Sequence, residues 1–435
     1  MNQFTFEGKT KTMLLGGIVI GVLSLILTFV MGGELASARF WSNFLHNSSF
    51  FLGIAFMATF AMSVWISAWS GWFVMSKRVF EAIAAFMGVG GLLMLVIAIG
   101  NFVGFHHLYH WNDAEAVATD AVLQGKSPFL NKTVYLLVTI SFVGLWWWMN
   151  RMIRNYSVDE DQNGTFGDFR HMFSSRKWAA GFLAFSGYSS AIAIWLWLMS
   201  VDAHWYSTLY AWYVGASWFV TTIAFSILLV IYLKSKGGLP NLNEDVIHDL
   251  GKFLFGFSIF WTYLWFSQYM LIWYGNVGEE TTYFWTRAHG YKFLFRLILV
   301  LNFPVPFLLL MSNSNKRKMG TLIFASIVII IGHWLDFFLM IKPGVRQTAE
   351  HMLHAGGEHV EAGHAEAGHE AAHAVVEHAA DIPFALGFSM PGILEIGTFV
   401  GFLSLFLFVI FNALSKAALE PAHDPFIEEA KHHHV

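Results

Sequence analysis

The feature that most constrains this fold is a succession of about ten apolar segments, each long enough to cross a lipid bilayer as a helix of roughly 20 residues. The composition agrees, because only 12% of the residues are charged, against about 25% in a soluble domain. Inside lipid, a helix satisfies its own backbone hydrogen bonds, so we predict an all-α polytopic membrane protein. The segments lie near residues 12–32, 49–74, 79–102, 132–152, 178–200, 209–233, 252–274, 291–311, 319–342 and 389–414.

Lysine and arginine residues in the short loops predict the topology, because such residues stay on the cytoplasmic side. They occur in alternate connections between the expected spans, whereas the other loops carry mainly Asp and Glu. Both termini are therefore predicted to be cytoplasmic. The first apolar run is too long for the core of a cleavable signal peptide, and we interpret it as a spanning helix. The basic regions contain Lys9 and Lys11, Lys77 and Arg78, Arg151 to Lys177, Lys234 and Lys236, and Lys316 to Lys318.

Several classes of redox and nucleotide site are excluded by residues that the chain lacks. With 0 cysteines it cannot form disulfides, bind iron–sulfur clusters through cysteine or attach haem c covalently. A membrane-embedded haem needs paired axial histidines, and the expected spans contain His333 alone. Neither a glycine-rich phosphate loop nor a basic patch is present, so a nucleotide-driven pump and nucleic-acid binding are not indicated.

The segment from Pro343 to Pro383 differs in composition, because its histidines are interleaved with Glu and Ala. Most steps between these histidines would place successive rings about 140° apart on a helix, so the rings would not share one face. A helical metal pair is typically spaced i, i+4, which only His369 and His373 meet. The two interpretations are a metal site and a solvated, partly helical insertion. We predict the insertion and no metal site.

The stretch from Leu250 to Arg287 carries a polar stripe through an apolar and aromatic helix. Ser258, Thr262 and Tyr269 lie at i, i+4 and i+11, so they occupy one helix face. Hydroxyl groups in lipid commonly bond their own backbone or a neighbouring helix. The alternative is a hydrated path inside the bundle, and the spacing leaves both interpretations open.

Charged residues inside the expected spans are costly and mark candidate functional positions. Asp336 and Arg296 lie at similar depths in adjacent spans, which predicts an ion pair that is either a structural lock or a control on protonation. His333 precedes Asp336 by one helical turn and shares its face. Together with polar residues at the cytoplasmic boundary, Asp336 and His333 suggest a proton path in two halves. How the two halves would join is left open. The candidate path is Asp249, Lys252, Ser258, Thr262, Tyr269, Arg296, His333 and Asp336.

Polar residues at the outer surface form a second candidate site. Asp202 and His204 directly follow the fifth expected span, and we expect them near His106 and His107. A protonatable group beside an apolar cleft would suit a quinol head group. Solvated loop residues are the alternative interpretation, and no catalytic residue is assigned.

Three stretches carry a resemblance to one family. Residues 200–208 contain S-V-D and W-Y-S-T, residues 266–281 read FSQYMLIWYGNVGEET, and residues 332–336 read GHWLD. These motifs resemble the ActF-type integral membrane subunit of bacterial alternative complex III, which is NrfD-like, or polysulfide-reductase-like. The likeness covers nearly all of the expected spans, and its most specific part is the run Q-Y-M-L-I-W-Y-G-N with the following E-E-T.

The resemblance implies a subunit of a respiratory quinol:cytochrome c (or other acceptor) oxidoreductase in the bacterial inner membrane. Haem c and iron–sulfur clusters are expected in partner subunits. These partners include a sister NrfD-like subunit, and a terminal oxidase is a further expected partner. This chain is expected to contribute structural support and a proton path rather than redox cofactors, which leaves open whether it is an enzyme in isolation.

Asp202 is similar to an aspartate associated with quinol oxidation in the sister subunit. The following residues differ, which leaves quinone or menaquinone binding open.

The resemblance also implies two four-helix bundles flanked by the first and last spans.

The alternative from another functional class is a stand-alone secondary transporter, because Pro304 and Pro306 could interrupt the eighth span. The expected divisions are 1–48 for the N-terminal segment with the first span, 49–200 and 201–342 for the two bundles, 343–388 for a periplasmic His/Glu/Ala-rich loop, and 389–435 for the last span and a cytoplasmic tail.

Overall fold

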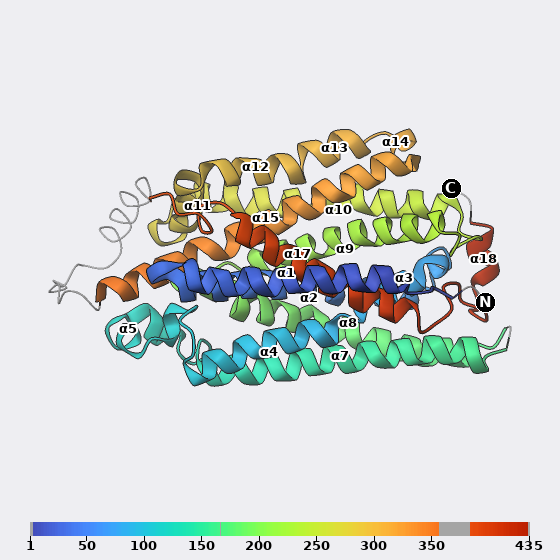
Figure 1. The fold of residues 1–435 in the computed structure, drawn as a ribbon, viewed down its shortest axis with the longest axis horizontal. Coiled ribbons are helices and arrows are strands. Elements are labelled where there is room, and N and C mark those ends of the chain that lie inside the picture. Colours follow the sequence, from blue (N-terminus) through green and yellow to red (C-terminus); the bar gives the residue numbers. More distant parts are fainter. Residues whose placement is uncertain (1–2, 166, 356–382, 434–435) are drawn as a thin grey trace.

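A computed structural model describes residues 3–165, 167–355 and 383–433. These residues are mostly helical, and their β structure is limited to isolated bridges. Nine helical stretches among them are long and apolar enough to cross a membrane, so the chain is an all-α, multi-pass membrane protein. The long helices lie along one axis, and the first and last described residues lie at the same end of the bundle (Figure 1). We call this the terminal end and the opposite one the distal end.

In chain order, the long helices comprise two groups of four and a pair formed by the first and the last, which pack along each other. The first group contains α2 (Ala36–Ser67), α4 (Met87–Val103), α7 (Lys132–Asn163) and α8 (Arg170–Trp197). The second contains α9 (Leu209–Ser235), α10 (Glu244–Gly275), α12 (Lys292–Asn302) with α13 (Pro304–Leu310), and α15 (Met319–Ala355). The flanking pair is α1 (Gly8–Met31) and α17 (Ile393–Leu414). Shorter helices used below are η2 (Val74–Ser76), α3 (Lys77–Ala84), α5 (Ala114–Thr119), α6 (Ala121–Lys126), η4 (Met199–Val201), α11 (Gly278–Gly290), α14 (Asn313–Arg317) and α18 (Ile427–Lys431).

Small residues allow α1 and α17 to pack closely although they are far apart in sequence. A Cβ atom on Gly21 would lie 2.4 Å from the Cα of Gly401, so neither position accepts a side chain without moving a helix. One turn away on either side, Gly17 faces Ser404 and Gly397 faces Ser24. Close backbone approach of this kind stabilises helix pairs in lipid, where apolar burial contributes little.

The second spanning helix begins well before its expected start. The sequence predicted a span over 49–74, whereas α2 runs from Ala36 to Ser67. Its polar first turns lie outside the predicted span, but Ser42, Asn43, His46 and Asn47 are buried and hydrogen bonded. Asn43 donates to Glu395 at 3.0 Å, and the Nε2 atom of His46 lies 2.9 Å from the Trp334 carbonyl oxygen. Partners on α15 and α17 thus allow polar side chains inside the bundle.

The ninth span also exceeds its expected range, since α15 continues through Pro343 to Ala355. A proline lacks the N–H that would bond the carbonyl four residues earlier, here Leu339. Arg287 of α11 supplies the missing donor, because its Nε lies 3.1 Å from the Leu339 oxygen. Its Nη2 also donates to the Met340 carbonyl at 3.0 Å. The helix therefore continues past the proline with its carbonyls satisfied.

The seventh and eighth expected spans each differ from a single, uniformly apolar helix. The eighth is divided at Phe303 into α12 and α13, with Pro304 at the first residue of α13, as the prolines suggested. The seventh, expected over 252–274, lies within the 32-residue helix α10, which packs along α9. It is not among the nine apolar stretches, because its tryptophan, tyrosine and glutamine residues lower the mean hydropathy.

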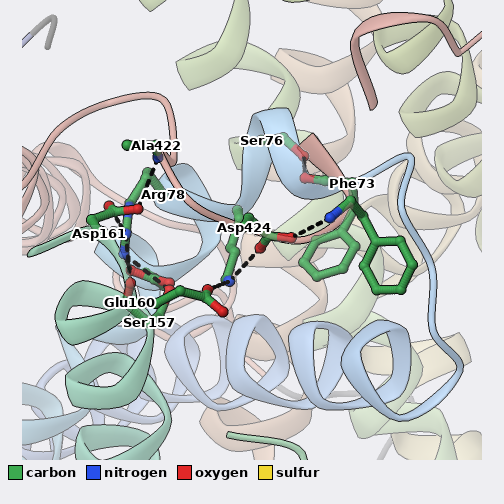
Figure 2. Close-up of polar contacts among 11 residues, drawn as sticks. Phe73, Ser76, Arg78, Ser157, Glu160, Asp161, Ala422 and Asp424 are labelled. Atoms are coloured by element: carbon green, nitrogen blue, oxygen red, sulfur yellow. Dashed lines mark hydrogen bonds and ion pairs between the residues drawn. The ribbon is translucent and has the colours of Figure 1, made fainter. Parts of the chain in front are cut away.

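At the terminal end, the C-terminal tail crosses a buried ionic cluster (Figure 2). The Nζ atom of Lys77 lies 2.8 Å from Oδ2 of Asp424, and Arg78 pairs with Asp161. The backbone N–H of Ala422 donates to Asp161 at 2.9 Å. These partners allow α7 to continue to Asn163, beyond the expected end at residue 152, because its acidic last turns face cations on α3.

Candidate functional site

The strongest candidate site surrounds Asp336, a carboxylate that is 2% exposed near the middle of α15. The hydroxyl of Tyr213 on α9 donates to its Oδ1 atom. Its Oδ2 atom is buried and has no hydrogen-bond partner among the described residues. Asp336 lines a cavity of about 20 Å³, together with Gln268, Tyr283 and Arg287. That volume holds about one water molecule, so a carboxylate oxygen and a water-sized space lie side by side.

His333 extends the site one turn towards the terminal end. Its Nδ1 atom lies 2.8 Å from the hydroxyl oxygen of Ser217, and its ring meets the edge of Trp261 at 5.1 Å. Ser217 lies one turn from Tyr213 on α9, just as His333 lies one turn from Asp336 on α15. The two helices therefore face each other with two matched polar pairs in a buried seam.

The cation beside this site is Arg287, which means that the predicted ion pair between Asp336 and Arg296 is wrong. Arg296 is exposed on α12, because its position in the helix turns it away from α15. Arg287 is 2% exposed, and its Nη2 atom lies 2.8 Å from Oδ2 of Asp202. Burial lowers the pKa of the Arg287 guanidinium, but Asp202 together with Tyr283 and Tyr210 raises that pKa by more, so the group stays charged. The similar depths of Asp336 and Arg296 in adjacent spans suggested the pair, but depth does not show which side chains face Asp336.

The polar stripe of α10 is explained by bonds within the helix. Ser258 donates to the Leu254 carbonyl at 2.7 Å, and Thr262 donates to the Ser258 carbonyl at 2.9 Å. The ring of Tyr269 is parallel to that of Trp265 at 5.8 Å. These contacts favour the packing interpretation over a continuous hydrated path along this face.

Two residues of the predicted path lie together at the terminal end. The Nζ atom of Lys252 lies 2.5 Å from Oδ1 of Asp249. The Nε2 atom of His433, in the C-terminal tail, lies 2.6 Å from Oδ2 of the same carboxylate. The neighbouring His248 is 3% exposed, and neither of its ring nitrogens has a partner among the described residues. This end therefore has protonatable groups, but α10 does not connect them by described hydrogen bonds to Asp336.

The predicted outer cluster does not form, because its members lie in three different environments. Asp202 pairs with Arg287, whereas His204 bonds Asp120 at an exposed position. His106 is buried with its Nε2 atom 2.9 Å from the Ile97 carbonyl oxygen, and burial lowers its pKa to about 4. His107 is exposed.

A buried network around Lys342 was missed in the sequence. Lys342 is fully buried on α15 and donates to Oδ1 of Asn43 at 2.6 Å and to Ser42 at 2.8 Å. Glu395 of α17 accepts from Asn43 and pairs with Arg39 at 2.8 Å. The available signal was a charge at or inside an apolar segment. Lys342 is the last residue of the predicted ninth span, and Glu395 lies inside the predicted tenth.

A comparison with protein-family models found no match, and a search of curated proteins found no significant match. Among the described residues, no group of three or more His, Cys, Asp or Glu side chains is arranged to hold a metal ion. The His-rich positions His359 to His378, including the pair His369 and His373, lie outside the described residues. The function is therefore argued from the site.

Proposed function

We propose that this chain is an integral membrane subunit of a respiratory quinol:electron-acceptor oxidoreductase of the alternative complex III type, located in a bacterial inner membrane. Its role is structural support and proton conduction, while haem c and iron–sulfur clusters belong to partner subunits. The observation that carries the proton role is Asp336, whose Oδ2 atom is buried without a partner among the described residues beside a water-sized cavity. Ionisable residues inside a membrane are costly and typically functional.

The contacts between motif residues support the family assignment. Gln268, from the most specific motif, donates to Ser207 at 2.8 Å, which belongs to the first motif. Trp205 of the first motif donates to the carbonyl of Glu280 at 3.2 Å. Asp336 of the third motif lines the same cavity as Gln268. The stretches that carry the resemblance, although distant in sequence, therefore meet at one place in the fold.

The size of the cavity favours a proton role over quinone binding. Pockets for organic ligands typically measure about 300–1,000 Å³, and the cavity beside Asp336 measures about 20 Å³. A proton needs only a protonatable group and a water or hydroxyl within hydrogen-bond distance. Tyr213 and Asp336 meet that requirement, and the Ser217–His333 pair repeats it one turn away. We assign these four side chains to a distal half-path.

A secondary transporter is the second candidate, and the break at Phe303 is the observation that favours it. Transporters often use interrupted helices around a midplane site. Both side-chain polar atoms of Asn302, which precedes the break, are buried without partners among the described residues. Proton conduction and solute transport could each use an interrupted helix beside unpartnered polar atoms.

Affinity purification of the tagged full chain from its native membrane separates the two functions. A complex subunit should copurify with proteins that show haem c absorbance and quinol oxidation, whereas a transporter should emerge without them. A preparation free of haem-bearing partners that accumulates a solute in vesicles would overturn the complex assignment.

A further inference from the structure

A groove on the lipid-facing side of α10 has no part in the site around Asp336. It measures about 540 Å³ and is lined by Phe253, Gly256, Phe257 and Phe260, with Lys252 at one end. These residues follow helical spacing, so they form one face that extends for about 12 Å along the axis. The groove is thus apolar along its length and cationic at the terminal end of the bundle.

Rigid aromatic contacts hold the phenylalanine side of the groove. The ring of Phe253 stacks on Trp72 with centroids 5.6 Å apart, and Trp65 approaches the same ring at 5.7 Å. Phe257 contacts Phe219 of α9 at 4.2 Å. The rings of Phe253 and Phe257 are therefore held from behind by Trp65, Trp72 and α9.

Gly256 keeps the floor of the groove open. A Cβ atom placed on Gly256 would meet no atom within 4 Å, so a larger side chain could enter the groove without a clash. In lipid, an apolar surface of this shape is solvated by hydrocarbon chains, because water is absent at that depth. An acyl chain is the ligand whose chemistry fits the phenylalanine-lined part.

The cationic end selects among head groups. The side chain of Lys252 is 43% exposed, and Asp249 engages one side of its ammonium. An ammonium has three donors, so donors remain for a phosphate. Lys316 on α14 lies within electrostatic range, since burial and then the charge of Lys252 lower the Lys316 pKa. Lys316 is thus a second cation near this end, and Asp249 offsets one of the two positive charges.

We infer that the α10 groove binds one acyl chain of an anionic phospholipid and that Lys252 holds its phosphate. The charge bias of the loops predicts that the Lys252 end is cytoplasmic, so the lipid comes from the inner leaflet. A zwitterionic head group fits less well, because its own ammonium would lie beside Lys252. Anionic lipids and basic side chains at this surface attract each other in general.

Native mass spectrometry of the full chain in mild detergent tests this site. The protein is offered equimolar phosphatidylglycerol and phosphatidylcholine with the same acyl chains. We expect one retained lipid per chain, with an approximately fivefold preference for phosphatidylglycerol, which corresponds to about 1 kcal/mol. Gly256→Leu should reduce retention of both lipids by filling the groove. Lys252→Gln should keep retention but remove the preference, and Lys252→Arg should restore it.

The matched control is Gly16→Leu, which adds the same side chain at a lipid-facing glycine of α1 that also has open space around its Cβ position. It should leave retention and preference unchanged. Unchanged retention in Gly256→Leu, or an unchanged preference in Lys252→Gln, would overturn the proposal. So would the recovery of a neutral lipid or a quinone as the retained ligand. None of these outcomes depends on whether the chain is a respiratory subunit.

Discussion

The Nε atom of Arg287 lies 3.1 Å from the carbonyl oxygen of Leu339, the carbonyl that Pro343 leaves without a donor from its own helix. The same guanidinium pairs with Asp202, so one side chain joins α11, α15 and the segment after η4. This contact keeps α15 helical beyond the proline. It also positions the wall of the cavity beside Asp336.

Replacing Arg287 should destabilise the chain strongly. Arg287→Met removes a buried cation and leaves Asp202 unpaired, for which we expect a loss of about 3–5 kcal/mol of unfolding free energy. Pro343→Ala, added to that variant, restores an N–H for Leu339 and should recover about 1 kcal/mol. The measurement is thermal unfolding in detergent of both single variants and the double variant. Additive effects would contradict the proposed link between Arg287 and the proline.

Replacing Glu395 should also lower the free energy of unfolding strongly. Glu395→Gln leaves the buried Lys342 and the partly buried Arg39 without a carboxylate, so we expect a loss of about 3 kcal/mol or more in the same unfolding assay. Adding Arg39→Gln should return part of that loss, because it removes one of the two unbalanced charges. Glu279→Gln, at an exposed position, is the control. Equal stability of the Glu279 and Glu395 variants would show that the network is not needed.

Acid should destabilise the chain through His106. Burial lowers the pKa of this imidazole to about 4, whereas an unfolded histidine titrates near 6.5. Between these values the unfolded chain binds a proton that the folded chain does not, so stability is full above pH 6.5 and falls as the pH decreases towards 4. The loss is at most about 3 kcal/mol. His106→Gln should show a shallower loss than the exposed-site control His107→Gln; identical pH profiles would contradict this explanation.

The predicted topology can be measured directly, because the chain has 0 cysteines and single cysteines can be introduced without background. A membrane-impermeant maleimide applied to spheroplasts should label Glu279→Cys, at the distal end. It should label Asn2→Cys only after the membrane is opened. The reverse pattern would show that the loop charges do not determine the orientation.

The helical spans could be predicted because lipid imposes a hydropathy signal on every segment that crosses it. The start of α2 could not, because its polar residues become acceptable only through Lys342 and Glu395, which lie about 300 residues further along the chain. The extension of α15 depends in the same way on Arg287, since a proline alone predicts a helix end.

The candidate site was partly predictable for a related reason. The expectation that Asp336 lies inside the bundle follows from its place within an apolar segment, and the residue is 2% exposed. Its partner depends on how neighbouring helices rotate about their own axes, which spacing within one helix does not specify. Tyr213 carries no charge and gave no signal, whereas the charged Arg296 faces outward.

Proton release by the assembled complex tests the central claim most directly. The complex that copurifies with the tagged chain is reconstituted into vesicles, and proton movement is measured during quinol oxidation for Asp336→Asn, Asp336→Leu and the exposed control Glu279→Gln. Asn still accepts a hydrogen bond from Tyr213, whereas Leu leaves that hydroxyl unpaired. If Asp336 relays protons, both variants assemble but lose the proton release that accompanies turnover, and the control retains it. Normal proton movement in a fully assembled Asp336→Asn complex would contradict the relay.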